Sequence, residues 1–134
     1  MSMAEGWDRN NELAALRQRN LSGSNLIIAK MWIYHRDLEH QAWRFSNAKS
    51  EFGRRYARVV VQMRHEGEKS AEVAGRVADM DEDVHNAHLA YRLAEQMVSA
   101  DKEALKILRA ELEAFRTQRA DERAADQFQA RQGV

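Results

Sequence analysis

Apolar side chains recur along this sequence at the spacing of α-helices rather than that of β-strands. Between Asn25 and about His65 they follow steps of three, four or seven, which places them on one side of a helix. These positions are Ile27, Met31, Tyr34, Leu38, Ala42, Phe45, Phe52, Tyr56, Val60 and Met63. The pattern predicts one long amphipathic helix over residues 25–65.

A more regular seam follows, in which apolar steps of four and three alternate as they do in helices that pack side by side. Its positions are Val73, Val77, Met80, Val84, Ala87, Tyr91, Ala94, Val98, Asp101, Leu105, Leu108, Leu112 and Phe115. Only Asp101 interrupts the apolar run. A polar residue there can set the register between packed helices, or it can mark a break capped by Ser99.

Residues that end or start helices divide the chain. A short helix is expected from Asp8 to Asn20, and Ser22–Ser24 ends it and caps the next one. Gly67 predicts a break near 66–70, after which Ser70 caps a new start. Acidic residues at 79–83 favour a helix N-terminus, so a kink or restart is expected near 79–82.

Together these elements predict an all-α fold. Residues 1–24 form a short helix and turn, and residues 25–119 form a long, extended helical hairpin that resembles a coiled coil. Residues 120–134 are rich in Ala, Gln, Arg and Asp, which predicts a frayed or disordered tail. Because so long a seam is hard to cover within one chain, we expect a homo-oligomer. Its interface would use Val84, Tyr91, Val98, Leu105, Leu108, Leu112 and Phe115.

Composition narrows the class of protein. The 134 residues include no cysteine and no proline, so thiolate nucleophiles, zinc ribbons and disulfide frameworks are excluded. No apolar segment has the length of a signal peptide core or of a membrane span. The expected location is therefore the cytoplasm, without membrane insertion.

Charge is unevenly distributed although the net charge is zero. Residues 24–66 hold 8 basic and 4 acidic side chains, whereas residues 67–134 hold 10 basic and 14 acidic ones. A basic segment can attract a polyanion, or it can meet an acidic face of a neighbouring subunit.

Aromatic and cationic side chains are interleaved along the basic helix. Trp32, Arg36, His40, Trp43, Asn47, Arg54 and Arg58 follow helical steps and share one side of it. Bases stacked on Trp, with Arg on phosphates, are typical of single-stranded nucleic-acid binding. The alternative is that the two Trp side chains are buried between subunits while the arginines are solvated or ion-paired. The candidate DNA-binding residues are Arg54, Arg55, Arg58, Trp43, Arg36, Trp32, Arg44 and Lys49.

Other chemistry has little support. Glu82 and His85, with His88 nearby, have the Glu-x-x-His spacing of dinuclear metal centres in helical bundles. The only similar spacing elsewhere in the sequence is that of Asp37 and His40. The simpler interpretation is exposed histidines near a helix start. We predict no metal and no other cofactor. Phosphate-binding glycine loops, nucleophile elbows and paired catalytic carboxylates are not recognisable, so we predict that the chain is not an enzyme.

The order of several motifs resembles the phage recombination mediators of the UvsY family over about residues 25–119. The similarity begins with Asn25–Ile28 and the pair Trp32–Ile33, and continues with the basic stretch Arg54–Arg58. After Gly67, the family's Ala-Asp-x-Asp-Val is similar to Ala78–Asp79 with Asp83–Val84, followed by Tyr91 and Ala104–Lys106. Arg55 and Arg58 are nearest to the family's Lys-Ala-Arg motif, and its glycine-rich segment is reduced to Gly67.

The resemblance implies a ring-like homo-oligomer that binds single-stranded DNA. Such a mediator helps a RecA-like recombinase to displace single-strand-binding protein, in a phage-infected or prophage-carrying bacterium. Two other hypotheses stay open. One is a structural or adaptor protein, such as a phage morphogenesis chaperone, which binds only proteins; the other is a helical metal-binding bundle.

Overall fold

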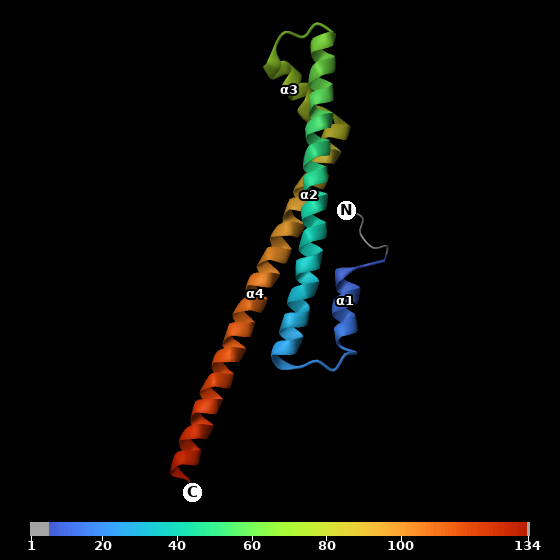
Figure 1. Ribbon diagram of the computed structural model, residues 1–134. Coiled ribbons are helices and arrows are strands. Elements are labelled where there is room, and N and C mark those ends of the chain that lie inside the picture. Colours follow the sequence, from blue (N-terminus) through green and yellow to red (C-terminus); the bar gives the residue numbers. More distant parts are fainter. Residues whose placement is uncertain (1–5, 134) are drawn as a thin grey trace. The chain divides into compact units, whose positions relative to one another are not determined.

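A computed structural model describes residues 6–133, and this part of the chain consists of helices joined by short turns, without β-strands (Figure 1). The four helices are α1 (Arg9–Leu16), α2 (Gly23–His65), α3 (Ala71–Met80) and α4 (Glu82–Gln132). The predicted all-helical class is therefore confirmed.

Helix α1 is shorter than the pattern predicted. The side chain of Asp8 caps it by accepting a hydrogen bond from the backbone N–H of Asn11 at 3.0 Å. The expected end was Asn20, but the helix stops at Leu16. After it, the N–H groups of residues 17–19 bond to carbonyls only three residues back, and Asn20 adopts a φ of 57°. This tighter winding and the left-handed residue end the helix.

The breaks between the later helices lie where the sequence placed them. Helix α2 begins at Gly23, in the predicted serine and glycine segment. Gly67 has a φ of 102°, and Ser70 caps α3 by accepting a hydrogen bond from the N–H of Val73 at 3.2 Å. Asp81 separates α3 from α4 and accepts a hydrogen bond from the N–H of Val84 at 3.1 Å. The turns before α3 and α4 thus each contain a capping hydrogen bond.

Helix α4 is longer and more regular than expected. It passes through Ser99 and Asp101 without interruption, so the predicted alternative of a break at Ser99 is wrong. It also continues to Gln132, whereas a frayed or disordered tail was expected from Ala120. Alanine, arginine, glutamine and glutamate are all strong helix formers, which explains a helical backbone even where every side chain is exposed.

The chain divides into two compact units, each of which we describe by itself. The first unit contains the described residues up to Leu38 and those from Asp101 onward, and the second contains Glu39–Ala100. Both units contain a segment of α2 and a segment of α4. In each unit these segments pack side by side in opposite directions, as the pairs Gly23 with Phe115 and Phe45 with Tyr91 indicate.

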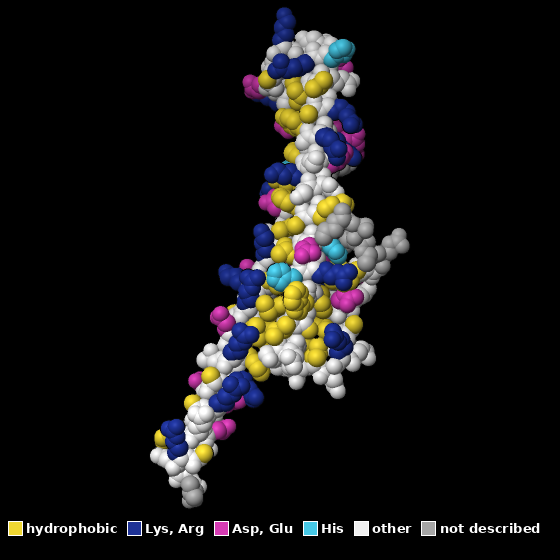
Figure 2. All heavy atoms as spheres, viewed as in Figure 1, with side chains coloured by type: hydrophobic (Ala, Val, Ile, Leu, Met, Phe, Trp, Pro, Cys, Tyr) yellow, Lys and Arg dark blue, Asp and Glu magenta, His cyan; other side chains and the backbone are white. Residues whose placement is uncertain are grey.

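The core of the first unit is a short leucine stripe. Leu105, Leu108 and Leu112 of α4 are buried, and so is Leu16 of α1. Helix α1 lies beside the first-unit part of α2 (Figure 1). Hydrophobic side chains gather on the face of this unit that is visible in Figure 2. Past Phe115, α4 has only exposed side chains, so the core ends there.

The second unit has an aromatic core. The rings of Phe45 and Tyr91 stack with centroids 5.4 Å apart, and Phe52 lies 6.0 Å from Tyr91 and 4.9 Å from His88. Val84 and Ala87 of α4 are also buried. These contacts join α2 to α4 within the unit.

Helix α3 packs with a different face from the one predicted. Val73, Val77 and Met80 were assigned to the buried seam but are 40%, 37% and 85% exposed. Instead the fully buried residues are Ala74 and Ala78. Small side chains let α3 approach α2 closely, and the hydroxyl oxygen of Tyr56 lies only 3.0 Å from where a Cβ on Gly75 would be. Close approach therefore decided the orientation of α3, leaving its valine face in water.

Replacing Gly23 with alanine should lower the free energy of unfolding by about 1–3 kcal/mol. Gly23 has a φ of 58°, which a side chain disfavours, and a Cβ there would lie 2.9 Å from Cζ of Phe115. Thermal unfolding followed by circular dichroism measures the effect. Gly53→Ala is the matched control, because Gly53 lies inside α2 with nothing within 4 Å of its Cβ position. That change should stabilise the helix by up to about 1 kcal/mol; equal losses for both variants would contradict the prediction.

Candidate nucleic-acid interface

In the second unit, one side of α2 faces away from the aromatic core and carries a tryptophan among arginines. At about 100° per residue, Trp43, Arg54 and Arg58 fall within roughly 60° of one another around the helix, and about 22 Å separates the first from the last along it. All three side chains are exposed, Trp43 by 47%. An exposed aromatic ring and cations therefore share one surface, which we call the α2 basic face.

Two of the arginines expected to bind DNA already form ion pairs within the chain. Glu51 accepts hydrogen bonds from Nη2 of Arg54 through Oε2 and from Nε of Arg55 through Oε1, both at 2.8 Å. The hydrogen bond from Arg55 is the main effect that lowers the pKa of Glu51. The carboxylate therefore stays ionised and holds both side chains. Arg55 is the less accessible of the two, half-buried beside the core.

The remaining cations of this segment are free of ion pairs within residues 6–133. They are the candidates Arg44, Lys49 and Arg58, together with Arg64 in the last turn of α2, all exposed. Arg44 lies next to the α2 basic face, whereas Lys49 is about 140° away from Arg54 around the helix. Lys49 is therefore close to the other candidates in sequence but lies on a different side of the helix. Arg58 and Arg44 are the side chains most available to a phosphate.

The other two candidates belong to the first unit. Trp32 is 72% exposed, and its ring centroid lies 6.4 Å from that of His35. The guanidinium of Arg36 lies over the ring of Trp7, 4.8 Å from the centroid, in a cation–π arrangement. Trp32 thus presents an open aromatic surface, while Arg36 is partly occupied by a ring of its own chain.

Within the second unit the two long segments carry opposite charge. Residues 39–65 contain six basic and two acidic side chains, whereas residues 71–100 contain two basic and six acidic ones. The positive potential of this unit is therefore concentrated on α2 and is not spread over its whole surface.

The seven residues proposed for oligomerisation lie in the cores of the single chain. Val84, Leu105, Leu108 and Leu112 are buried, and the other three, Tyr91, Val98 and Phe115, are half-buried. The seam is thus covered largely by side chains of the same molecule. The large apolar side chains that remain exposed are elsewhere: Trp32, Trp43, Val61, Val73, Val77, Met80, Leu89, Leu93, Ile107 and Phe128.

The residues with metal-site spacing are not assembled into a metal site. No group of three or more His, Asp or Glu side chains in the described part of the chain is arranged to hold a metal ion. His88 instead packs against Phe52, and His85 is exposed. Across residues 6–133, none of the helices combines the length and apolar character needed to cross a membrane.

Sequence reasoning missed a cluster of buried charge in the first unit. Asp101 of α4 is fully buried, and its Oδ1 lies 2.9 Å from Nη1 of Arg9 in α1. The same nitrogen lies 3.5 Å from Oδ2 of Asp37 in α2. The interruption of the apolar seam at Asp101 was the available signal, because a buried carboxylate requires a partner. The identity of that partner was not readable from spacing.

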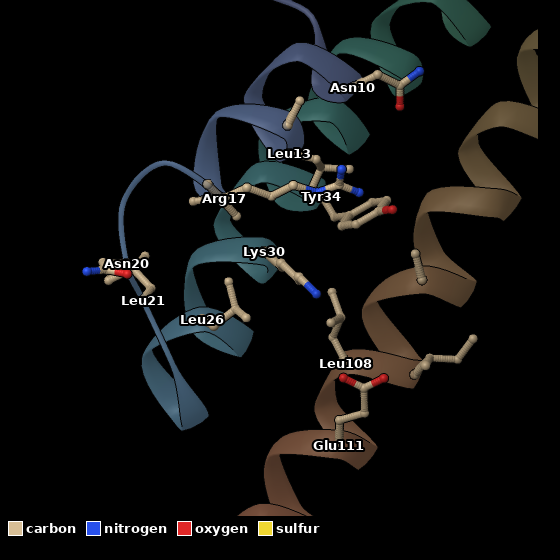
Figure 3. A pocket seen from close by; sticks show the side chains of 14 residues that line it. Asn10, Leu13, Arg17, Asn20, Leu21, Leu26, Lys30, Tyr34, Leu108 and Glu111 are labelled. Carbon is tan, nitrogen blue, oxygen red and sulfur yellow. The ribbon is translucent and has the colours of Figure 1, made fainter.

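A hollow of about 790 Å³ also lies in the first unit, between α1, α2 and α4. Leucine side chains line it together with Lys30 and Tyr34 of α2, Arg17 after α1 and Glu111 of α4 (Figure 3). The side chains of Lys30 and Arg17 extend toward its interior (Figure 3). It is an open surface hollow with apolar walls and charges of both signs.

Comparisons of this chain with protein-family models, with curated proteins and with solved structures found no match.

Proposed function

We propose that this chain is a non-enzymatic accessory protein that binds single-stranded DNA through the α2 basic face. The observation that supports the proposal best is the exposure of Trp43 beside Arg54 and Arg58, on the side of α2 opposite the aromatic core. A ring can stack on any base and guanidinium groups can contact any phosphate, so binding would be independent of sequence. Arg44 extends the same surface.

The sequence resemblance extends this proposal to recombination. In that role the protein acts as a mediator of phage-type recombination or replication, and helps a RecA-like recombinase to load where single-strand-binding protein is bound. It acts by positioning its partners, without bond chemistry. We further propose that it works as a homo-oligomer in the cytoplasm of a bacterial host. Exposed apolar side chains such as Met80, Leu89 and Leu93 support association.

Binding of a fluorescent single-stranded oligonucleotide, measured by anisotropy at several salt concentrations, tests the DNA-binding proposal. The double variant Arg44→Ala/Arg58→Ala, which removes two exposed arginines that form no ion pair within residues 6–133, should bind at least tenfold more weakly at low salt. The slope of log K against log salt should also become shallower by about 1.4, because each phosphate contact on a single strand contributes about 0.7. Trp43→Ala should weaken binding by about 1–3 kcal/mol if one base stacks on it.

The matched control removes two arginines from the acidic side of the same unit. Arg76 and Arg92 are exposed and each pairs with a glutamate on its own helix. The variant Arg76→Ala/Arg92→Ala has the same change in net charge, but neither residue lies on the α2 basic face, so it should keep wild-type affinity and slope. Equal weakening by both double variants would mean that only net charge matters, and would contradict a defined face.

A second candidate function is an adaptor that binds only proteins. It is favoured by the valine face of α3, where Val73, Val77 and Met80 remain in water. The same anisotropy measurement separates the two. An adaptor gives no binding to the oligonucleotide even at low salt, whereas the DNA-binding protein gives binding that salt weakens steeply.

A further inference from the structure

The surface hollow of the first unit has the size and the walls of a small-molecule site. Its volume of about 790 Å³ lies within the range of about 300–1,000 Å³ that is usual for such sites. Helix α1, the turn after it, α2 and α4 all contribute to its lining. The large aliphatic side chains of the lining are Leu13, Leu16, Leu21, Leu26, Ile107 and Leu108. The hollow can therefore hold the apolar body of a ligand out of water.

Two cations extend into this apolar hollow. Figure 3 shows that the side chains of Lys30, from α2, and Arg17, from the turn after α1, reach toward its interior. Neither side chain forms an ion pair within residues 6–133. Lys30 is half-buried, and a charge beside apolar walls attracts an opposite charge more strongly than it does in bulk water. The hollow thus combines a place for an aliphatic chain with two groups that can bind an anion.

One carboxylate, that of Glu111 on α4, shares the lining. Glu111 is exposed, and it pairs with neither cation. The charged residues of the lining are these three, so positive charge exceeds negative charge by one. A ligand with one negative charge balances the lining, whereas a cationic ligand would meet two like charges and a single opposite one.

We propose that this hollow binds a small amphipathic anion, namely a carboxylate attached to an aliphatic chain. Lys30 and Arg17 donate hydrogen bonds to the carboxylate, and charge-assisted bonds of this kind are the stronger ones. The chain lies against the leucine side chains of α1 and α4. The site belongs to the first unit, whereas the α2 basic face belongs to the second, so this proposal does not rest on DNA binding.

Titration of octanoate into the isotope-labelled protein at a pH of about 7, followed by amide chemical shifts in NMR spectra, tests the proposal. The shifts should saturate and should centre on α1 and on residues 104–111, while the α3 amides stay unchanged. Hexanoate is two methylene groups shorter. It should bind up to about fifteenfold more weakly, because each buried methylene group contributes up to about fourfold in affinity.

Octanol and octylammonium test the recognition of charge, because they carry a tail of the same length on a neutral and on a positive head group. Both should bind at least about tenfold more weakly than octanoate. Equal affinities for the three ligands would mean that the hollow collects only apolar tails. Tighter binding of octylammonium would mean that Glu111 dominates the site. Either result would overturn the proposal, as would shifts centred on the valine face of α3.

Substitution of the cations locates the head group. Lys30→Met removes the charge but keeps a long side chain, so it should weaken octanoate binding by at least about tenfold without weakening octanol binding. Lys106→Met is the matched control, because Lys106 is exposed on α4 and does not line the hollow. Arg17→Met, at an exposed position, gives the same test if Lys30→Met does not fold. Wild-type octanoate affinity in both Lys30→Met and Arg17→Met would overturn the proposal.

The oligonucleotide measurement keeps this site separate from the α2 basic face. Saturation with octanoate should leave the anisotropy of a bound single-stranded oligonucleotide unchanged. Displacement of the oligonucleotide would place the carboxylate on the α2 basic face instead and would overturn the assignment to the hollow. A protein that binds octanoate but no oligonucleotide would support this proposal and contradict only the proposed function.

Discussion

Replacing Leu105 with alanine is expected to lower the free energy of unfolding by about 2–5 kcal/mol. Leu105 is only 3% exposed and lies in the leucine stripe of the first unit with Leu108 and Leu112. The loss combines the transfer free energy of the missing carbon atoms with the cost of the cavity left behind. Urea unfolding monitored by circular dichroism measures it. Such a loss is a large fraction of the total for a domain of this size.

A neighbouring residue on the same helix supplies the matched control. Ile107 is 52% exposed and rests at the edge of the surface hollow. Ile107→Ala removes a similar number of carbon atoms but leaves no closed cavity, so it should cost less than about 1 kcal/mol. If both variants lose equal stability, the intramolecular packing of the leucine stripe is contradicted. If Leu105→Ala instead unfolds in a concentration-dependent way, the stripe is also used between subunits.

The helices could be predicted because their signals are local. Steps of three and four place apolar side chains on one side of a helix, and the caps at Ser70 and Asp81 act on amides three residues away. A sequence shows such relations directly. Hydrophobicity alone does not predict the extension of α4 to Gln132, because these residues are polar and have no core to pack against, whereas their helix propensity favours a helical backbone.

The orientation of α3 could not be predicted from the same pattern. Val73, Val77 and Met80 continue the heptad steps, and hydrophobicity alone assigns them to the core. The helix instead buries Ala74 and Ala78, because a face of small residues permits a shorter distance to α2. Which face of α3 is buried depends on the shape of the α2 surface opposite it, including the position of Tyr56. That surface is formed by tertiary structure and is not encoded in spacing.

The candidate interface was predictable to a similar, limited extent. Helical spacing correctly places Trp43, Arg54 and Arg58 on a common side of α2. The pairing of Glu51 with Arg54 and Arg55 also follows from spacing, because these arginines lie three and four residues further along the helix. The Arg9 cluster is different. Its members come from three helices, and only the packed unit brings them together.

Arg9→Ala is expected to destabilise the first unit by about 3 kcal/mol at a pH of about 8. The substitution removes a cation that lies within 3.5 Å of two buried carboxylates. Removal of one partner from a buried ion pair costs about 3–5 kcal/mol, and the lower end applies because the Arg9 side chain is 23% exposed. At a pH of about 5 the cost should shrink to about 1 kcal/mol, because the carboxyl pair then takes up a proton. Urea unfolding at both pH values measures the difference.

The sign of this pH dependence separates the electrostatic contribution of Arg9 to stability from its packing contribution. Burial raises the pKa of Asp101 and Arg9 lowers it, so removal of Arg9 raises the pKa further and leaves the pair protonated over a wider range. The variant therefore loses most stability at the higher pH, where the two carboxyl groups must both ionise. A packing loss would be independent of pH, as expected for the methylene carbons of Arg9. Arg17→Ala, an exposed change just after α1, should alter stability by no more than about 0.5 kcal/mol at either pH. Equal losses for Arg9→Ala at both pH values would show that its guanidinium does not balance the carboxylates.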